Sequence, residues 1–260
     1  MADRDDYHLI LCRARQSAVT DSPDAKHRAF EEELLALLTS DGRTTLTVAP
    51  HLIDLTPDGL AIRRLRSLDG NLIVLSWLPA RATYWLLRAA GIEGHRESET
   101  PAVGTRRLLC LDLRKYPDPA ACVEAICRIM SAAQLPATEG GKPAEAELLD
   151  ESTQPRWYPV IDYDRCVNCL ECLNFCLFGV YDLDASEAVF VDQPDACRPG
   201  CPACARVCPS GAIMFPEYAD PAISGDATDE TKPPSDKSNK PSDRLSTLDR
   251  LVDEVDDLDV

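Results

Sequence analysis

Eight cysteines gather in two short stretches of the chain, CVNCLECLNFC at residues 166–176 and CRPGCPACARVCP at 197–209. In the first stretch, gaps of two, two and three residues separate the thiols. Each two-residue gap is one tight turn, so three successive thiolates can face one iron–sulfur cube while the fourth points elsewhere. The pattern indicates [4Fe–4S] chemistry. Two structural zinc sites stay open as an alternative, because cysteine spacing alone also permits zinc.

The segment 157–216 resembles the bacterial two-cluster ferredoxins, through both cysteine runs, the approach YPVIDYDRC and the Cys-Pro that closes the second run. The resemblance implies a small α+β ferredoxin-like module with two [4Fe–4S] clusters that transfer single electrons. It also implies the ligands of each cluster. Those of the first are Cys166, Cys169, Cys172 and Cys208, and those of the second are Cys176, Cys197, Cys201 and Cys204.

The sequence departs from the family pattern at two points. Three residues separate Cys197 from Cys201 where the family commonly has two, and Leu177 stands where a proline usually follows. Apolar runs at 178–184 and 188–192 predict a hairpin between the two motifs. A shell of apolar side chains is expected to limit water access to the clusters. Its members are Val167, Leu170, Phe175, Phe178, Val180, Val189, Ile213 and Phe215.

No catalytic acid, base or nucleophile is evident in the cysteine module. We therefore expect an electron carrier or a subunit of a redox complex rather than a stand-alone enzyme. Four further cysteines have no ligand spacing and are expected to be ordinary buried thiols. They are Cys12, Cys110, Cys122 and Cys127.

Residues 1–130 alternate between two kinds of segment. Apolar, strand-like runs at 7–14, 44–54, 71–79 and 106–114 alternate with helical patterns at 22–40, 56–68, 80–91 and 118–130. Four strand–helix units in series predict a parallel sheet covered by helices on both faces. The expected fold class is thus an α/β parallel-sheet domain, followed by the ferredoxin-like module and a disordered acidic tail.

Composition sets the expected boundaries after residue 130. The segment 131–155 has no periodicity and is predicted to be a linker to the module at 156–216. Residues 217–243 offer almost nothing to bury and are predicted to be disordered. Residues 244–260 regain an apolar stripe that predicts an amphipathic helix, bound either to a partner or to the protein's own surface.

The role of the α/β domain is left open by its residues. Ligands gather at the carboxyl ends of parallel strands, where this chain offers Arg13, Arg15, His51, Trp77, Arg81, Arg114, Lys115 and Tyr116. Such residues could bind an anion, a nucleotide or a flavin, or could dock the acidic module. No GxGxxG or GxxxxGK[ST] motif supports a nucleotide. A lone histidine such as His51 is more typical of surface or packing positions than of metal ligands.

The net charge is −17 and is unevenly distributed. Residues 131–260 carry 26 Asp and Glu against 10 Lys and Arg, whereas residues 1–130 carry 18 against 17. Such acidity disfavours nucleic acid and favours a redox partner with a basic docking patch. The sequence contains no run of about 18 apolar residues, so no membrane span is predicted. The acidic start MADRDDYH does not resemble a signal peptide. We therefore expect a cytoplasmic protein with reduced cysteines.

Overall fold

A computed structural model describes residues 7–15, 23–41, 45–96, 106–132 and 146–226, which belong to one compact unit. The amphipathic helix expected at 244–260, and residues 227–243 of the expected disordered segment, lie outside the described residues. Within the described ranges, no helix combines the length and the apolar character needed to cross a bilayer.

Five parallel strands form the sheet of the α/β domain. They are β1 (Tyr7–Cys12), β2 (Thr45–Ala49), β3 (Asn71–Ser76), β4 (Leu108–Asp112) and β5 (Ala146–Leu148). Their order across the sheet is β4-β3-β1-β2-β5, and every neighbouring pair is parallel. The four predicted strands are confirmed. The strand order reverses at β1, so a topological switch point lies between β1 and β3.

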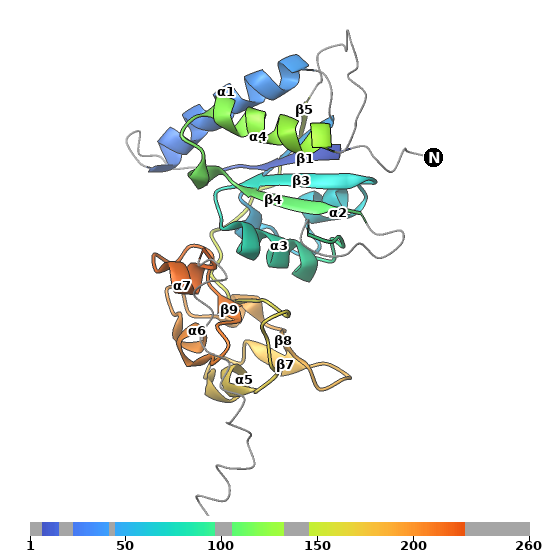
Figure 1. Cartoon of the computed structure of the whole chain (residues 1–260). Coiled ribbons are helices and arrows are strands. Elements are labelled where there is room, and N and C mark those ends of the chain that lie inside the picture. Colours follow the sequence, from blue (N-terminus) through green and yellow to red (C-terminus); the bar gives the residue numbers. More distant parts are fainter. Residues whose placement is uncertain (1–6, 16–22, 42–44, 97–105, 133–145, 227–260) are drawn as a thin grey trace, which may run out of the picture. The chain divides into compact units, whose positions relative to one another are not determined.

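Helices cover both faces of this sheet, as predicted (Figure 1). One face carries α1 (Pro23–Asp41) and α4 (Pro119–Ala132), and the other carries α2 (Leu60–Arg66) and α3 (Ala80–Ala89). Short 3-10 helices lie at Leu52–Asp54, Leu113–Lys115 and Pro194–Ala196. Side chains alternate along each strand, so Leu9 and Leu11 enter the core under α1 and α4 while Ile10 enters the other core.

Local signals explain where several helices begin and end. The side chain of Asp118 accepts a hydrogen bond from the backbone of Ala121 at 2.8 Å and caps α4. Gly91 has a φ of +74° and ends α3, as its position predicts. The helix expected from residue 56 begins later, because the Gly59 amide donates to the Thr56 carbonyl in a tight turn at 3.0 Å.

The sheet extends into the segment 131–155, which the sequence predicts to be a linker. Strand β5 pairs with the outer edge of β2, where Glu147 lies opposite Thr47. The carboxylate of Glu147 accepts hydrogen bonds from Arg64 Nε at 2.8 Å and from the Thr47 hydroxyl at 3.2 Å. Backbone pairing and polar contacts therefore hold this strand, which buries too little apolar surface to give an alternating pattern.

The cysteine module consists of short elements around two antiparallel strand pairs. In chain order they are β6 (Val160–Ile161), α5 (Glu171–Phe175), β7 (Tyr181–Leu183), β8 (Val189–Val191), α6 (Ala203–Val207), β9 (Ile213–Met214) and α7 (Pro221–Ser224). Strand β6 pairs with β9, and β7 pairs with β8. The second pair is the predicted hairpin at 178–184 and 188–192.

The cysteine module shares an apolar core with the α/β domain. Val160 and Met214, which oppose each other in β6 and β9, are buried in one cluster with Ala82 of α3. The ring of Trp85, also on α3, meets the ring of Tyr163 edge-on, with 5.6 Å between centroids. The two regions are therefore packed against each other.

The module also continues beyond residue 216, into the range expected to be disordered. The Phe215 amide donates to the Ile223 carbonyl at 2.8 Å, and the Asp220 side chain caps α7 by accepting from Ala222 at 3.0 Å. Ile223 is buried in the core that surrounds the cysteines. A buried isoleucine, a capped turn and ion pairs of Glu217 and Asp226 thus hold residues 217–226, although their composition is polar.

Candidate metal centre

The β6–β9 pair brings Cys208 beside the first cysteine run. Cys166 lies five residues after Ile161. Cys208 lies five residues before Ile213, which opposes Ile161 in the antiparallel pair. In an antiparallel pair, the residues that follow one strand lie at the same end as the residues that precede the other strand. Cys166 and Cys208 therefore both lie beyond the same end of the β6–β9 pair.

The β7–β8 hairpin brings together Cys176 and Cys197 in the same way. Cys176 lies five residues before Tyr181, and Cys197 lies six residues after Val191. Tyr181 and Val191 oppose each other in the hairpin. Each strand pair thus carries one cysteine from one motif to the thiols of the other motif.

The loop between Cys166 and Cys172 turns through two left-handed residues. Asn168 and Leu170 have φ angles of +52° and +62°, a conformation that is costly for leucine and is retained where the surroundings enforce it. The Asn168 side chain accepts from the Val189 amide at 2.9 Å and ties this loop to the hairpin. The loop can therefore point three successive thiols to one side.

Electrostatic proximity divides the eight thiols into two groups of four. The first thiol group is Cys166, Cys169, Cys172 and Cys208, and the second thiol group is Cys176, Cys197, Cys201 and Cys204. The four thiols of each group are the four cysteines that the resemblance to two-cluster ferredoxins implies as ligands of one cluster. The binding of a cluster by these residues stays a prediction.

The thiols differ in exposure and in acidity. Cys172 and Cys204 are buried, whereas Cys169 is exposed. Burial, with a further contribution from neighbouring thiols, raises the pKa of Cys172 and of Cys204 to about 12 and that of Cys197 to about 11. Without metal these groups are protonated at neutral pH, so iron must displace their protons when it binds.

A cavity of about 440 Å³ lies beside the second thiol group, at the place where a cluster would bind. Its walls include all four thiols of that group together with Phe178, Val180 and Tyr181. In the part of the chain that the structure describes, no three His, Cys, Asp or Glu side chains are placed to bind one metal ion. Four thiols that line one apolar cavity match the four-cysteine ligand set of a [4Fe–4S] cluster.

The predicted apolar shell is only partly buried. Val180, Val189, Ile213 and Phe215 are buried as expected, and Leu170 is partly buried. Phe175 and Phe178 line the cavity beside the second thiol group but are partly open to solvent, whereas Val167 is exposed, and Leu177 is 92% exposed. A module of this size has too little chain to cover all its apolar side chains. An exposed apolar surface therefore borders the cysteines.

Two aromatic residues of the site, Trp157 and Tyr181, are not among those predicted from the sequence. The ring of Trp157 stacks on Phe215, with 5.2 Å between centroids, and its Nε1 donates to the Cys201 carbonyl at 3.2 Å. The only signal for Trp157 in the sequence is its place immediately before the approach segment.

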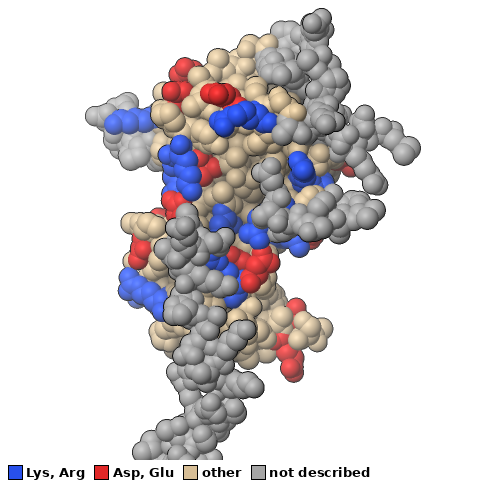
Figure 2. All heavy atoms as spheres, viewed as in Figure 1, with Lys and Arg blue, Asp and Glu red and all other residues tan. Residues whose placement is uncertain are grey.

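The basic strand ends of the α/β domain bind acidic residues of the cysteine module. The ion pairs are Arg15–Glu217 at 2.6 Å, Arg81–Asp162 at 2.5 Å and Arg114–Asp226 at 3.2 Å. Figure 2 shows Lys and Arg side chains interspersed with Asp and Glu on one face of the molecule. Docking of the acidic module was one of the alternatives left open by the sequence, and these contacts support it.

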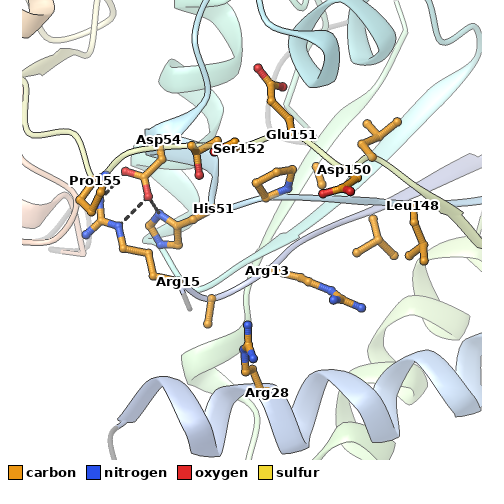
Figure 3. Close-up of a pocket in the computed structure, with 16 residues that line it drawn as sticks. Arg13, Arg15, Arg28, His51, Asp54, Leu148, Asp150, Glu151, Ser152 and Pro155 are labelled. Carbon is orange, nitrogen blue, oxygen red and sulfur yellow. Dashed lines mark hydrogen bonds and ion pairs between the residues drawn. The ribbon is translucent and has the colours of Figure 1, made fainter. Parts of the chain in front are cut away.

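A second pocket, of about 650 Å³, lies at the carboxyl ends of β1, β2 and β5 (Figure 3). Arg13 and Arg28 contribute to its lining, and the Nε of Arg13 is buried without a hydrogen-bond partner among the described residues. His51 packs at its edge, with Nδ1 3.7 Å from a carboxylate oxygen of Asp54. The pocket therefore offers guanidinium groups to a ligand, and the carboxylates of Asp150 and Glu151 also line it.

The four remaining cysteines lie in the α/β domain, away from the two thiol groups. Cys12 and Cys122 are buried, and Cys110 and Cys127 are partly buried. Burial raises the pKa of Cys12 and of Cys122 to about 12. Cys12 and Cys122 are therefore protonated thiols at neutral pH, as expected for packing residues.

Comparison with known proteins finds similarity over a length close to that of the cysteine module. The chain is 46% identical over 66 residues to an uncharacterized ferredoxin of Methanocaldococcus jannaschii, covering 25% of this chain and 44% of that protein. It is 36% identical over 59 residues to a ferredoxin of Methanothermococcus thermolithotrophicus, covering 22% of this chain and 95% of that protein. It is 31% identical over 72 residues to a sulfite dehydrogenase subunit of Allochromatium vinosum, covering 24% of this chain and 30% of that protein. The chain thus spans less than half the length of the first and the last of these relatives. No family model matches the sequence.

Proposed function

Because the chain belongs to the ferredoxin family through its cysteine module, we propose that it carries two [4Fe–4S] clusters and relays electrons to or from a larger oxidoreductase. The first thiol group, Cys166, Cys169, Cys172 and Cys208, would bind one cluster, and the second, Cys176, Cys197, Cys201 and Cys204, the other. The observation that carries the proposal is this division of the thiols, in which each group takes one distant cysteine across an antiparallel strand pair.

The surrounding residues support electron transfer rather than catalysis. A bound [4Fe–4S] cluster accepts and releases single electrons at a potential set by hydrogen bonds, charge and solvent exposure. The sulfur of Cys208 accepts a hydrogen bond from the Ala212 amide at 3.3 Å. Buried Val180, Val189 and Phe215 limit the access of water. These residues hold and shield a redox group.

We expect the partner to be a redox protein with a basic patch. The acidic excess of residues 131–260 favours such a partner through long-range attraction. Exposed Val167, Leu177 and Phe178 would add apolar contact beside the thiols. The similarity to a sulfite dehydrogenase subunit supports assembly with a redox enzyme. A second contact through residues 244–260, and a cytoplasmic location, stay predictions.

Anaerobic purification followed by iron and acid-labile sulfide analysis tests the proposal. Two cubes require about eight irons and eight sulfides per chain. The Cys172→Ser variant should lose iron, whereas the control Cys127→Ser, which changes a thiol outside both groups, should retain it. A colourless protein with bound zinc and no labile sulfide would instead establish the structural zinc alternative.

A second candidate function belongs to the α/β domain. The pocket in Figure 3 lies at the carboxyl ends of β1, β2 and β5, which is the side of the sheet where open parallel sheets bind ligands, next to the switch point between β1 and β3. The unpartnered Nε of Arg13 belongs to a lining that also includes Arg28. Guanidinium groups recognise phosphate through paired hydrogen bonds. We infer that a flavin or nucleotide phosphate is the ligand this pocket suits, which would make the chain a subunit of a redox enzyme.

Flavin absorbance of the purified protein and calorimetric titration with FMN and with inorganic phosphate test this second function. Binding should disappear in the Arg13→Gln, Arg28→Gln double variant. It should persist in Arg63→Gln, which removes an exposed arginine outside the pocket. If neither probe binds the wild-type protein, the pocket has no phosphate-binding function and the α/β domain serves to dock the module.

A further inference from the structure

Tyr181 places a buried hydroxyl group beside the second thiol group. Its side chain is only 6% exposed and lines the 440 Å³ cavity together with Cys176, Cys197, Cys201 and Cys204. Its oxygen has no hydrogen-bond partner of good geometry among the described residues. Its nearest polar group is the thiol of Cys204, which interacts with the hydroxyl both by charge and by a hydrogen-bonding contact.

A hydroxyl in an apolar wall whose nearest polar group is a thiol calls for an explanation, because burying it without a hydrogen bond of good geometry costs free energy. Phenylalanine would fill the same space without that cost. The ordinary pKa of tyrosine is about 10, so at neutral pH the group keeps its proton and acts as a neutral hydroxyl that can donate one hydrogen bond.

We propose that the Tyr181 hydroxyl donates a hydrogen bond to a sulfur of the cluster held by the second thiol group, and that this bond raises the reduction potential of that cluster. The inference rests on the proposed function, because it requires the two clusters. One electron arriving from the redox partner adds one negative charge that spreads over the cluster and its sulfurs. The Tyr181 dipole stabilises that charge without transferring its proton.

The first thiol group has hydrogen-bonding contacts of its own. The sulfur of Cys208 accepts from the backbone amide of Ala212 at 3.3 Å and lies 3.6 Å from the hydroxyl of Ser210. Tyr181 adds a side-chain donor to the second group. Electrons in equilibrium between the two sites should therefore favour the second group more than they would without Tyr181.

A redox titration of the holoprotein, followed by electron paramagnetic resonance, tests the inference with the Tyr181→Phe variant. We expect one midpoint potential to fall and the other to stay unchanged, with iron and sulfide contents equal to those of wild type. Tyr158→Phe is the matched control, because Tyr158 is a half-buried tyrosine of the same module whose charged neighbours include no cysteine. Both of its midpoints should match those of wild type.

Unchanged midpoints in a Tyr181→Phe protein that retains its iron would overturn the inference and leave the proposed function intact. Absence of iron and sulfide from the wild-type protein would instead remove the proposed function itself. If the variant fails to retain iron, pulsed resonance of the reduced wild-type protein in H2O and D2O decides. A rapidly exchanging proton coupled to one cluster is expected, and its absence would overturn the inference.

Discussion

Arg81, at the start of α3, donates from Nε to Asp162 Oδ2 at 2.5 Å and from Nη2 to the carbonyl of Gly211 at 3.0 Å. The Asp162 carbonyl accepts from the Cys166 amide at 3.0 Å, and the Gly211 amide donates to the Cys208 carbonyl at 3.2 Å. One arginine of the α/β domain thus holds both chain segments that bring Cys166 beside Cys208. The α/β domain helps to position the first thiol group.

Replacing Arg81 with Met should lower the free energy of unfolding by about 3 kcal/mol, because the buried Asp162 carboxylate loses its main partner. The loss lies at the low end for buried pairs, since Arg165 remains 3.7 Å from the same carboxylate. Denaturation and iron analysis should show that the first thiol group loses iron before the second. Arg88→Met, which breaks an exposed pair with Glu93, should cost no more than about 1 kcal/mol.

A double variant separates the charge effect from a general packing effect. Arg81→Met combined with Asp162→Leu removes both charges, and it should recover part of the stability that the single variant loses. A single variant as stable as wild type, with full iron content, would show that this contact does not support the first thiol group.

Cys169→Ser should change one cluster and leave the other. Cys169 is an exposed member of the first thiol group, and a serine oxygen is a poor substitute for a thiolate on iron. Electron paramagnetic resonance of the reduced protein should show a simpler spectrum in place of the coupled signal of two clusters. Cys127→Ser should leave the coupled signal as it is. A wild-type spectrum from Cys169→Ser would mean that the ligand assignment is wrong.

Much of the α/β domain can be predicted because its signals are local. Strand β3, NLIVLS, is buried along its whole length, and such a run specifies a central parallel strand without reference to the rest of the chain. Gly91 specifies the end of α3 through its positive φ. Strand β5 gives no such signal, because its pairing with β2 depends on an open sheet edge that forms only in the folded protein.

In the candidate site, too, the features with a local sequence signal could be predicted and those that depend on tertiary packing could not. Cysteine spacing is a local signal, and the resemblance it supports implies which thiols gather. The pairing of Arg81 with Asp162 joins residues 81 positions apart. Tyr181 looks like any aromatic strand residue until the cavity beside it is known. Both depend on tertiary packing, which composition and periodicity do not describe.

Ile223→Ala should destabilise the cysteine module by about 2–5 kcal/mol, because Ile223 is buried in the core around the cysteines. The control Leu177→Ala truncates an exposed aliphatic side chain of the same module and should stay within about 0.5 kcal/mol of wild type. Thermal denaturation followed by cluster absorbance measures both. Equal stability of the two variants would show that residues 217–226 are not part of the module.

Glu31 predicts how stability depends on pH. Its carboxylate is buried and accepts hydrogen bonds from the Ala14 amide at 2.6 Å and from Trp77 Nε1 at 2.7 Å. Burial raises the pKa of Glu31, and these bonds, with the charges of Arg13 and Arg28, oppose only part of the rise. The folded protein therefore binds this proton more tightly than the unfolded chain does.

Wild-type stability should accordingly fall as pH rises from about 4.3, the ordinary Glu value, through the raised pKa of Glu31 in the folded state. Glu31→Gln binds no proton at this site. The free energy of unfolding of wild type minus that of the variant should therefore decrease across this pH window and level off above it. The total decrease should be about 1.4 kcal/mol for each pH unit by which folding raises the pKa of Glu31. Urea denaturation in a pH series measures the difference, and Glu33→Gln, an exposed change on α1, corrects for the loss of one negative charge. A difference that rises with pH would mean that burial does not control the acidity of Glu31.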